Sequence, residues 1–252
     1  MSAKPFPGVN QGAPRPTANR IVIRTDFSTH SRGFFSFMGP IAYHSLRKAK
    51  FDCHYYCDGM LASTLFSIVL RRSIRRISFD YTSIAQPFFE ECQQQAKRVL
   101  VVGGTAADAA SFGQHLKLNY PRLPFRCLDG YPSGGYTARQ LELLKTVACE
   151  FDVVLLALGS PLQEKVGQYL FDRLFPGTII TAGAFITQTV VAGARPYYPR
   201  LINTLHLRFI WRLLREPHTR SRFRLVFKFP FSYLIDRIRG NIEIICHEDA
   251  AS

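Results

Sequence analysis

Short runs of Val, Ile and Leu alternate with segments of helical periodicity along the middle of this chain. The strand-like runs are residues 98–102, 125–128, 152–158 and 178–181. The helix-like segments between them are residues 105–120, 137–149 and 163–174. Continuous apolar runs are typical of strands buried on both faces. Their alternation with helices predicts an α/β fold, with a mostly parallel, Rossmann-like sheet and helices on both faces.

The strand-like runs end at turns that contain glycine. These turns are Gly103-Gly104, Asp129-Gly130, Gly159-Ser160-Pro161 and Gly183-Ala184. In parallel α/β sheets, ligands bind beyond the carboxyl ends of the strands. We therefore expect the four turns to lie at one edge of the sheet and to form the active site.

The two ends of the chain differ from this middle part. Residues 1–19 are rich in Pro, Gly and Asn, which predicts a flexible tail. Residues 20–198 form the expected α/β catalytic domain. Residues 199–252 are expected to form a basic amphipathic appendage of helical character that contacts membranes and adds a final strand.

The net charge of +14 predicts an anionic partner. Residues 195–240 carry eleven Lys and Arg against two acids, so they hold +9 of this charge. Their basic residues alternate with aromatic ones, as in segments that lie in the headgroup region of an anionic leaflet. A nucleic-acid-binding protein is the alternative, but the sequence shows no helix-turn-helix, RRM or zinc-finger pattern. We therefore expect a membrane partner and no nucleic acid.

The strongest helix signal in the basic segment covers residues 199–216, before Pro217. Arg208, Arg212 and Arg215 fall on one stripe of this helix, beside an apolar stripe. We expect these arginines to bind phosphate groups or the membrane surface. The alternative is a solvated helix face, the usual position of charged residues.

Six cysteines occur in a chain whose first residues lack the apolar core of a secretory signal. We expect reduced thiols and a cytoplasmic protein that is peripheral on the inner face of the plasma membrane. No run of about 18 apolar residues predicts a membrane-spanning helix. A zinc site at Cys53 and Cys57, with Cys246 and His247, is an alternative with little support, because a structural site needs four ligands at defined spacing.

Several short motifs occur in the order found in one known family. They are CDG (57–59), RISFD (76–80), LVVGG (100–104), LGSPLQE (158–164), GAF (183–185), AG (192–193), YYP (197–199) and LRFIWRLLREP (207–217). Together they resemble the WecG/TagA/CpsF glycosyltransferases, family twenty-six, over roughly residues 50–225. The YYP and SFD forms are similar to the exopolysaccharide branch of this family. One element departs from the pattern: where the family has a "TLN" strand before the DG element, only residues 51–57 stand in its place.

The resemblance implies an inverting, metal-independent hexosyltransferase without a cofactor. Its donor is a UDP-sugar, with UDP-glucose suggested by the branch, and its acceptor is a polyprenyl-diphosphate-linked sugar. The family's base corresponds to Asp58, and a carboxylate suits removal of the acceptor hydroxyl's proton. An Asp-Gly turn without catalytic function is the alternative. A non-catalytic membrane scaffold is the rival function, and self-association stays open.

The same resemblance assigns further substrate-binding residues. They are Arg76, Asp80, Gly103, Gly104, Gly159, Pro161 and Gln163, and Asp129 is added because it follows a strand end at the same edge. The Arg76 guanidinium is suited to neutralise a diphosphate, and Gln163 is expected to hold a sugar hydroxyl or the nucleotide. Glu164 is interpreted as structural. Asp80 as a helix cap, and Asp129 and the two glycines as ordinary turns, are the alternatives.

Overall fold

The structure is a computed structural model that describes residues 19–27, 32–193 and 217–247, with side chains in the last range from residue 224. Eight strands within these ranges form one sheet. They are β1 (Asn19–Arg24), β2 (Gly33–Met38), β3 (His54–Cys57), β4 (Val99–Gly103), β5 (Phe125–Leu128), β6 (Val153–Ala157), β7 (Thr178–Thr181) and β8 (Ile242–Cys246). The expected α/β class is confirmed.

The strand order is β5-β4-β6-β7-β2-β3-β1-β8, and neighbouring strands are parallel throughout. The sheet is therefore fully parallel rather than mostly so. From β4 the chain passes to β5 on one side and then to β6 on the other. Such a reversal opens a crevice at the carboxyl edge, which is where ligands bind in this class of sheet.

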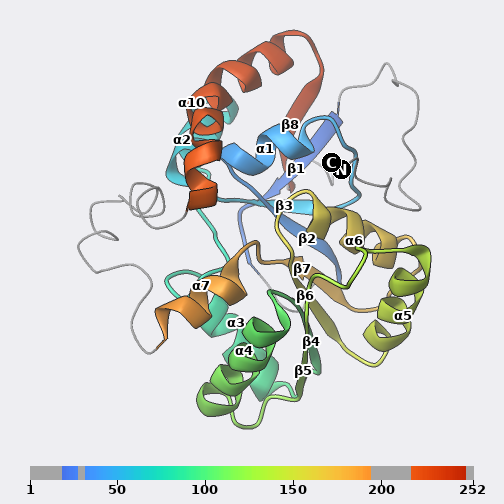
Figure 1. The fold of residues 1–252 in the computed structure, drawn as a ribbon. Coiled ribbons are helices and arrows are strands. Elements are labelled where there is room, and N and C mark those ends of the chain that lie inside the picture. The colour runs from blue at the N-terminus through green and yellow to red at the C-terminus, as the bar shows by residue number, and fades with distance from the viewer. Residues whose placement is uncertain (1–18, 28–31, 194–216, 248–252) are drawn as a thin grey trace.

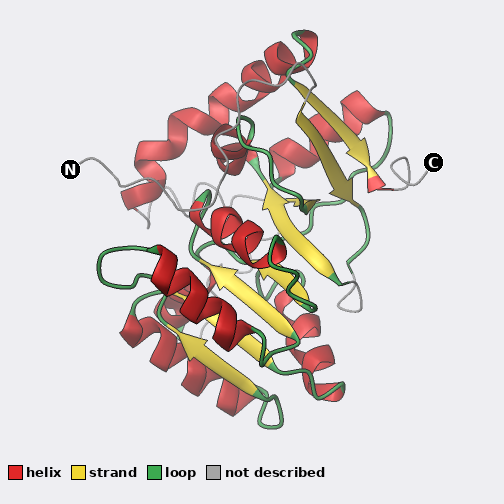
Figure 2. Ribbon diagram, turned by 90° about the vertical axis from the view of Figure 1, so that its right-hand side faces the viewer, coloured by secondary structure: helices red, strands yellow, loops and turns green. Residues whose placement is uncertain are grey.

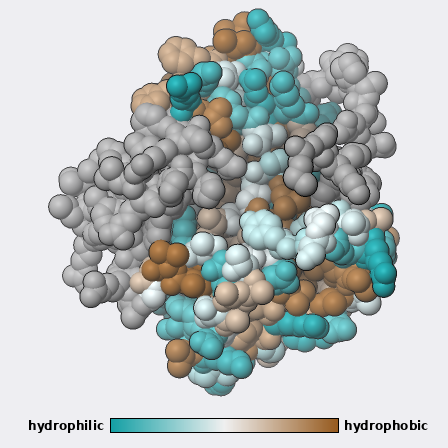
Figure 3. All heavy atoms as spheres, in the orientation of Figure 1, coloured by the Kyte–Doolittle hydropathy of each residue, from teal (hydrophilic) through white to brown (hydrophobic). Residues whose placement is uncertain are grey.

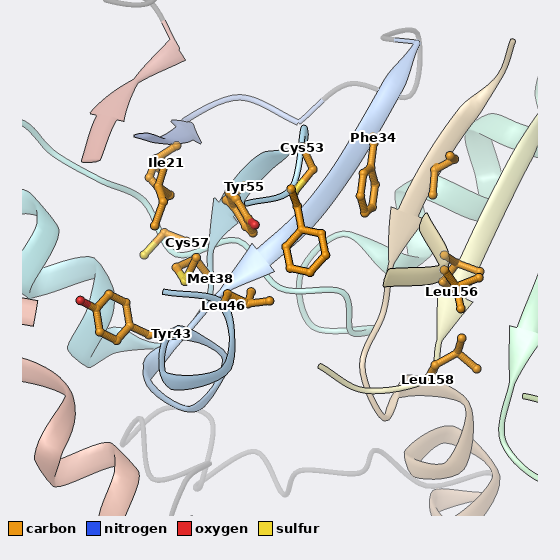
Figure 4. Close-up of a cluster of buried hydrophobic side chains, with 14 of the residues drawn as sticks. Ile21, Phe34, Met38, Tyr43, Leu46, Cys53, Tyr55, Cys57, Leu156 and Leu158 are labelled. Carbon is orange, nitrogen blue, oxygen red and sulfur yellow. The ribbon is translucent and has the colours of Figure 1, made fainter. Parts of the chain in front are cut away.

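Helices cover both faces of the sheet (Figures 1 and 2). One face carries α1 (Pro40–Leu46), α2 (Met60–Leu70), α5 (Ala138–Ala148), α6 (Leu162–Phe171) and α10 (Pro217–Ile238). The other carries α3 (Ala85–Gln94), α4 (Ala106–Asn119) and α7 (Phe185–Ala192). Each layer buries its own apolar cluster, and Figure 4 shows the first one around β2 and β3. Burial of both faces explains the unbroken apolar runs of β4 and β6.

Strand β2 and helix α1 are among the elements that the sequence analysis did not predict. β2 lies between β3 and β7, in the middle of the sheet. Its sequence, GFFSFM, lacks the β-branched residues that indicated β4, β6 and β7. The strand that leads directly to Asp58 is β3, which occupies His54–Cys57 within residues 51–57. β2 lies earlier in the chain and pairs with it.

The final part of the chain joins the body of the protein. Phe229 and Tyr233 of α10 are fully buried and contact the ring of Tyr43 on α1. β8 then pairs with β1, from Asn19 opposite Ile242 to Ile23 opposite Cys246. The described part of the expected appendage therefore supplies a packed helix and the edge strand of the sheet.

Within the described ranges, every helix is too short or too polar to span a bilayer. All six cysteines lie within the described ranges as free thiols. Burial raises the pKa of the Cys53, Cys57 and Cys92 thiols, which keeps them in the unreactive protonated form.

Candidate active site

The glycine turns after β4, β5 and β6 meet at the carboxyl edge of the sheet. A Cβ atom on Gly103 would lie 2.4 Å from the carbonyl oxygen of Ala157, and one on Gly130 would lie 2.7 Å from the Cα atom of Gly103. The N–H of Gly130 donates to the carbonyl of Gly104 at 2.9 Å. Gly104 and Gly159 also have positive φ angles of 68° and 72°. Close approach therefore explains Gly103 and Gly130, and the positive φ angle explains Gly159.

Asp58 lies at the same edge, directly after β3. Its N–H donates to the carbonyl of Met38 at 2.9 Å, and the carbonyl of Cys57 accepts from the N–H of Ile77 at 2.8 Å. The backbone around Asp58 is thus hydrogen-bonded to Met38 at the end of β2 and to Ile77 in the segment after α2. Its side chain is 41% exposed, so the carboxylate is open to a substrate.

Arg76 brings a positive charge to this carboxylate. Its Nε lies 3.6 Å from Oδ1 of Asp58, and its Nη2 lies 3.3 Å from Oδ2 of Asp80. Ser78 Oγ accepts from Arg76 at 2.6 Å and donates to Asp80 at 2.7 Å. The structure therefore joins three of the predicted residues, Asp58, Arg76 and Asp80, in one cluster. Asp80 also accepts from the N–H of Thr82 at 2.8 Å, so it both caps this turn and orients Arg76.

A buried polar network lies beneath the turns after β6 and β7. Glu164 is fully buried, and its Oε1 accepts from Ser36, Ser160 and Gln163 at 2.8, 2.8 and 3.0 Å. Its other oxygen, Oε2, has no hydrogen-bond partner among the described residues. Burial raises the pKa of the Glu164 carboxyl, against the effect of these three donors. Burial is the largest cause of the shift, and it disfavours the charged form of the acid.

Gln163 belongs to the same network. Its side chain is only 3% exposed, and its Oε1 accepts from the N–H of Gly183 at 3.0 Å. Gln163 therefore ties the turn after β7 to α6, and its direct contact with a sugar stays a prediction. Gly159 and Pro161 accept backbone hydrogen bonds from Gln163 and Lys165, and so begin α6 at this edge.

Two members of this network were missed in the sequence. Ser36 donates to Glu164, and Thr181 Oγ1 donates to Ser36 at 3.0 Å. Both are fully buried; Ser36 interrupts the apolar residues of β2, and Thr181 is the last residue of β7. A polar residue inside an apolar run is the signal that could have indicated Ser36, because buried polar groups need partners.

A groove of about 600 Å³ lies between α4 and β5. Ala106 and Asp129 line the end of this groove next to the glycine turns, and Lys117 and Phe125 line its other end. Asp129 follows the second strand of the β4–α4–β5 unit, the position at which an acid binds the ribose hydroxyls in nucleotide-binding folds. Asp129, Gly103 and Gly104 thus lie at the carboxyl ends of β4 and β5. Asp58 and Arg76 lie at the carboxyl end of β3.

The helices that begin at this edge fall into two groups. α4 and α5 have their first N–H groups satisfied by Thr105 with Asp108 and by Thr137 with Gln140. α1, α2, α6 and α7 begin without a side-chain cap. Their N-termini, which carry partial positive charge, leave N–H groups available to an anion. The central part of the edge is therefore more favourable to phosphate groups than the N-terminus of α4.

Arg208, Arg212 and Arg215 lie outside the described residues. The zinc alternative gains no support, since the described ranges contain no group of three or more His, Cys, Asp or Glu side chains that suits a metal ion. His54 and His247 do approach each other, with ring centroids 5.0 Å apart.

An open carboxylate near an arginine, at the carboxyl edge of a parallel sheet whose other strands end in glycine turns, is typical of nucleotide-dependent enzymes of the α/β class. Comparison with known proteins identifies which one. Residues 46–242 match the model of the glycosyl transferase WecG/TagA/CpsF family, so the chain belongs to that family. It is also similar to a Shigella boydii protein, UDP-Gal:alpha-D-GlcNAc-diphosphoundecaprenol beta-1,4-galactosyltransferase. The two are 27% identical over 197 residues, which cover 76% of this chain and 81% of the relative.

Proposed function

We propose that this glycosyltransferase moves a hexose, with inversion, from a UDP-sugar to a polyprenyl-diphosphate-linked sugar during exopolysaccharide synthesis. The observation that carries the proposal is the contact between Asp58 and Arg76 at the carboxyl edge. The Asp58 carboxylate removes the proton of the acceptor hydroxyl, whose oxygen attacks the anomeric carbon of the donor as UDP leaves from the opposite face. UDP-glucose is the proposed donor. The relative's name specifies UDP-Gal, which makes UDP-galactose the first competitor to test.

The leaving diphosphate needs positive charge, and we propose that cationic and backbone groups replace a metal. Arg76 is present beside Asp58, and α2, α6 and α7 begin at the same edge without side-chain caps. Guanidinium and N–H groups that are already oriented stabilise charge as it develops. We further propose that Asp129 binds the ribose of the donor in the groove beside α4.

The proposed site of action is the inner face of the plasma membrane. Exposed apolar side chains on α10 support this: Phe227, Phe231, Leu234, Ile235 and Ile238. Exposed basic residues of α10 lie among them, and Figure 3 shows apolar and hydrophilic surface side by side over this helix. This mixture fits the headgroup region of an anionic leaflet.

The test is UDP release from UDP-sugars with a short-chain polyprenyl-diphosphate glucose acceptor, in buffer with EDTA. We expect turnover without divalent metal, a product of inverted anomeric configuration by NMR, and no turnover in Asp58→Asn. Loss of turnover on adding EDTA would contradict the metal-free step. Full turnover in Asp58→Asn would favour a different base, whereas absence of turnover in wild type would favour a scaffold. Deleting the chain from residue 201 is not a clean test, because it also removes the buried Phe229 and strand β8.

A further inference from the structure

Helix α2 presents an exposed stripe that the proposed reaction does not use. Met60, Leu61 and Ile68 are 45%, 40% and 69% exposed, and Thr64 between them is exposed as well. At 3.6 residues per turn these positions fall within about 100° of one another. The opposite side of the helix carries buried residues that pack on the body of the protein, namely Ala62, Ser63 and Phe66. The stripe is thus a continuous outer face rather than a set of scattered residues.

The segment between Asp58 and Asp80, which contains this stripe, carries positive charge only. Residues 59–79 contain four arginines and no acid or lysine. Arg71 caps α2 at its C-terminus, and Arg71 and Arg75 are exposed. The segment that holds them is fixed to α2, because the carbonyl of Ile74 accepts from Ser63 Oγ at 2.5 Å and its N–H donates to Ser67 Oγ at 2.9 Å. An apolar face bordered by fixed arginines is complementary to an anionic bilayer surface.

The positions of Asp58 and of helix α10 next to α2 support a lipid partner over a protein partner. At its N-terminus the stripe starts two residues after Asp58, and Arg76 lies against that carboxylate. On its inner side, Phe66 contacts the rings of Phe229 and Tyr233, so α2 packs directly on α10. α10 is the helix with the exposed apolar and basic residues, and Figure 1 shows the two helices together. The α2 stripe therefore lies on a helix that packs against the proposed membrane-facing helix.

We infer that the outer face of α2, with Arg71 and Arg75, is a second membrane-binding surface, built into the catalytic domain itself. This inference rests on the proposed function. It gives the active site a physical link to its acceptor: sugar, diphosphate and lipid are joined covalently, so the base must lie close to the bilayer. With α2 about 16 Å long and its N-terminus at Asp58, the helix in contact with lipid holds the carboxylate at the headgroup level.

The test uses the full chain and vesicles of phosphatidylglycerol and phosphatidylcholine in equal parts. The variant Ile68→Glu/Arg71→Glu should bind these vesicles at least about tenfold more weakly than wild type, because it removes an apolar contact and reverses one charge. The matched control is Arg139→Glu/Leu143→Glu on α5, which also changes one exposed arginine and one exposed leucine, the latter 58% exposed. The control should bind as wild type does. Equal binding by wild type and the α2 variant, or equal loss in both variants, would overturn the inference.

A second measurement guards against a folding defect. Ile68→Trp and Leu143→Trp each add a tryptophan to the same background, and brominated phospholipid should quench only the first. Absence of that difference would overturn the inference, as would a change of oligomeric state in the α2 variant, which would assign the stripe to a second copy of the chain. The α2 variant should also keep wild-type turnover on a water-soluble, short-chain acceptor and lose it on a vesicle-embedded one. If wild type releases no UDP from either acceptor, it is the proposed function that fails, whatever the vesicles show.

Discussion

The attachment of α10 to the body of the protein depends on one buried aspartate, which makes a quantitative prediction. Asp236 Oδ2 accepts from Tyr43 Oη and from Arg47 Nη1, each at 2.7 Å. Tyr43 is fully buried, and Asp236 is 8% exposed. Asp236→Ala would leave the Tyr43 hydroxyl without this acceptor inside the protein and would remove the partner of Arg47.

The expected size of the effect follows from these contacts. A hydrogen bond to a charged group contributes about 1.5–3 kcal/mol, and the Arg47 contact is discounted because that side chain is 26% exposed. We expect Asp236→Ala to lower the free energy of unfolding by about 3 kcal/mol, and Tyr43→Phe by about 1.5 kcal/mol. A double-mutant cycle should give a coupling energy of about 1–2 kcal/mol between them.

The assay is urea unfolding followed by circular dichroism. The control is Asp26→Ala, which removes an ion pair of 3.1 Å to Arg24 from a carboxylate that is 64% exposed; it should change stability by less than about 0.5 kcal/mol. Burial alone would raise the pKa of Asp236, but the bonds from Tyr43 and Arg47 outweigh it and lower the pKa. The stabilisation is therefore present above the ordinary pKa of about 3.9 and is lost as pH falls toward the folded value. If Asp236→Ala matches Asp26→Ala at neutral pH, the assigned role is wrong.

Three further predictions concern the edge of the sheet. Arg76→Lys should lower kcat more than it raises KM for the donor, because Lys cannot form two parallel bonds to phosphate; steady-state kinetics check this, and an unchanged kcat refutes it. Glu164→Gln should keep most activity, since one amide oxygen can accept the same three bonds, whereas Glu164→Ala should lose it. Burial raises the pKa of the Glu164 carboxyl, so wild type should lose stability relative to Glu164→Gln as pH rises above about 4.3. A difference in unfolding free energy that stays constant with pH contradicts the argument. Gly103→Ala should destabilise by about 1–3 kcal/mol in thermal unfolding through contact with Ala157, unlike Gly113→Ala, whose added Cβ meets only ordinary contacts at 3.7 and 3.8 Å.

Local pattern determined much of this protein. Runs such as residues 152–158 indicated buried strands because strands covered on both faces need apolar side chains at every position. Their glycine ends indicated the active edge, and the ordered motifs indicated the family. β2 was not predicted because its sequence is dominated by phenylalanine and methionine. A short apolar run of this kind does not distinguish a strand from a buried helix segment.

Only the tertiary structure decided which residues meet. The strand order sets β3 beside β2 and β1, and the return of the chain to Cys57 brings Arg76 to Asp58. Ser36 and Glu164 are 128 positions apart, yet they share a buried hydrogen bond. β8 joins the first strand of the chain rather than a separate appendage. Strand pairing and side-chain packing are non-local, since they depend on which crossovers bury the most surface together, and no local pattern encodes that choice.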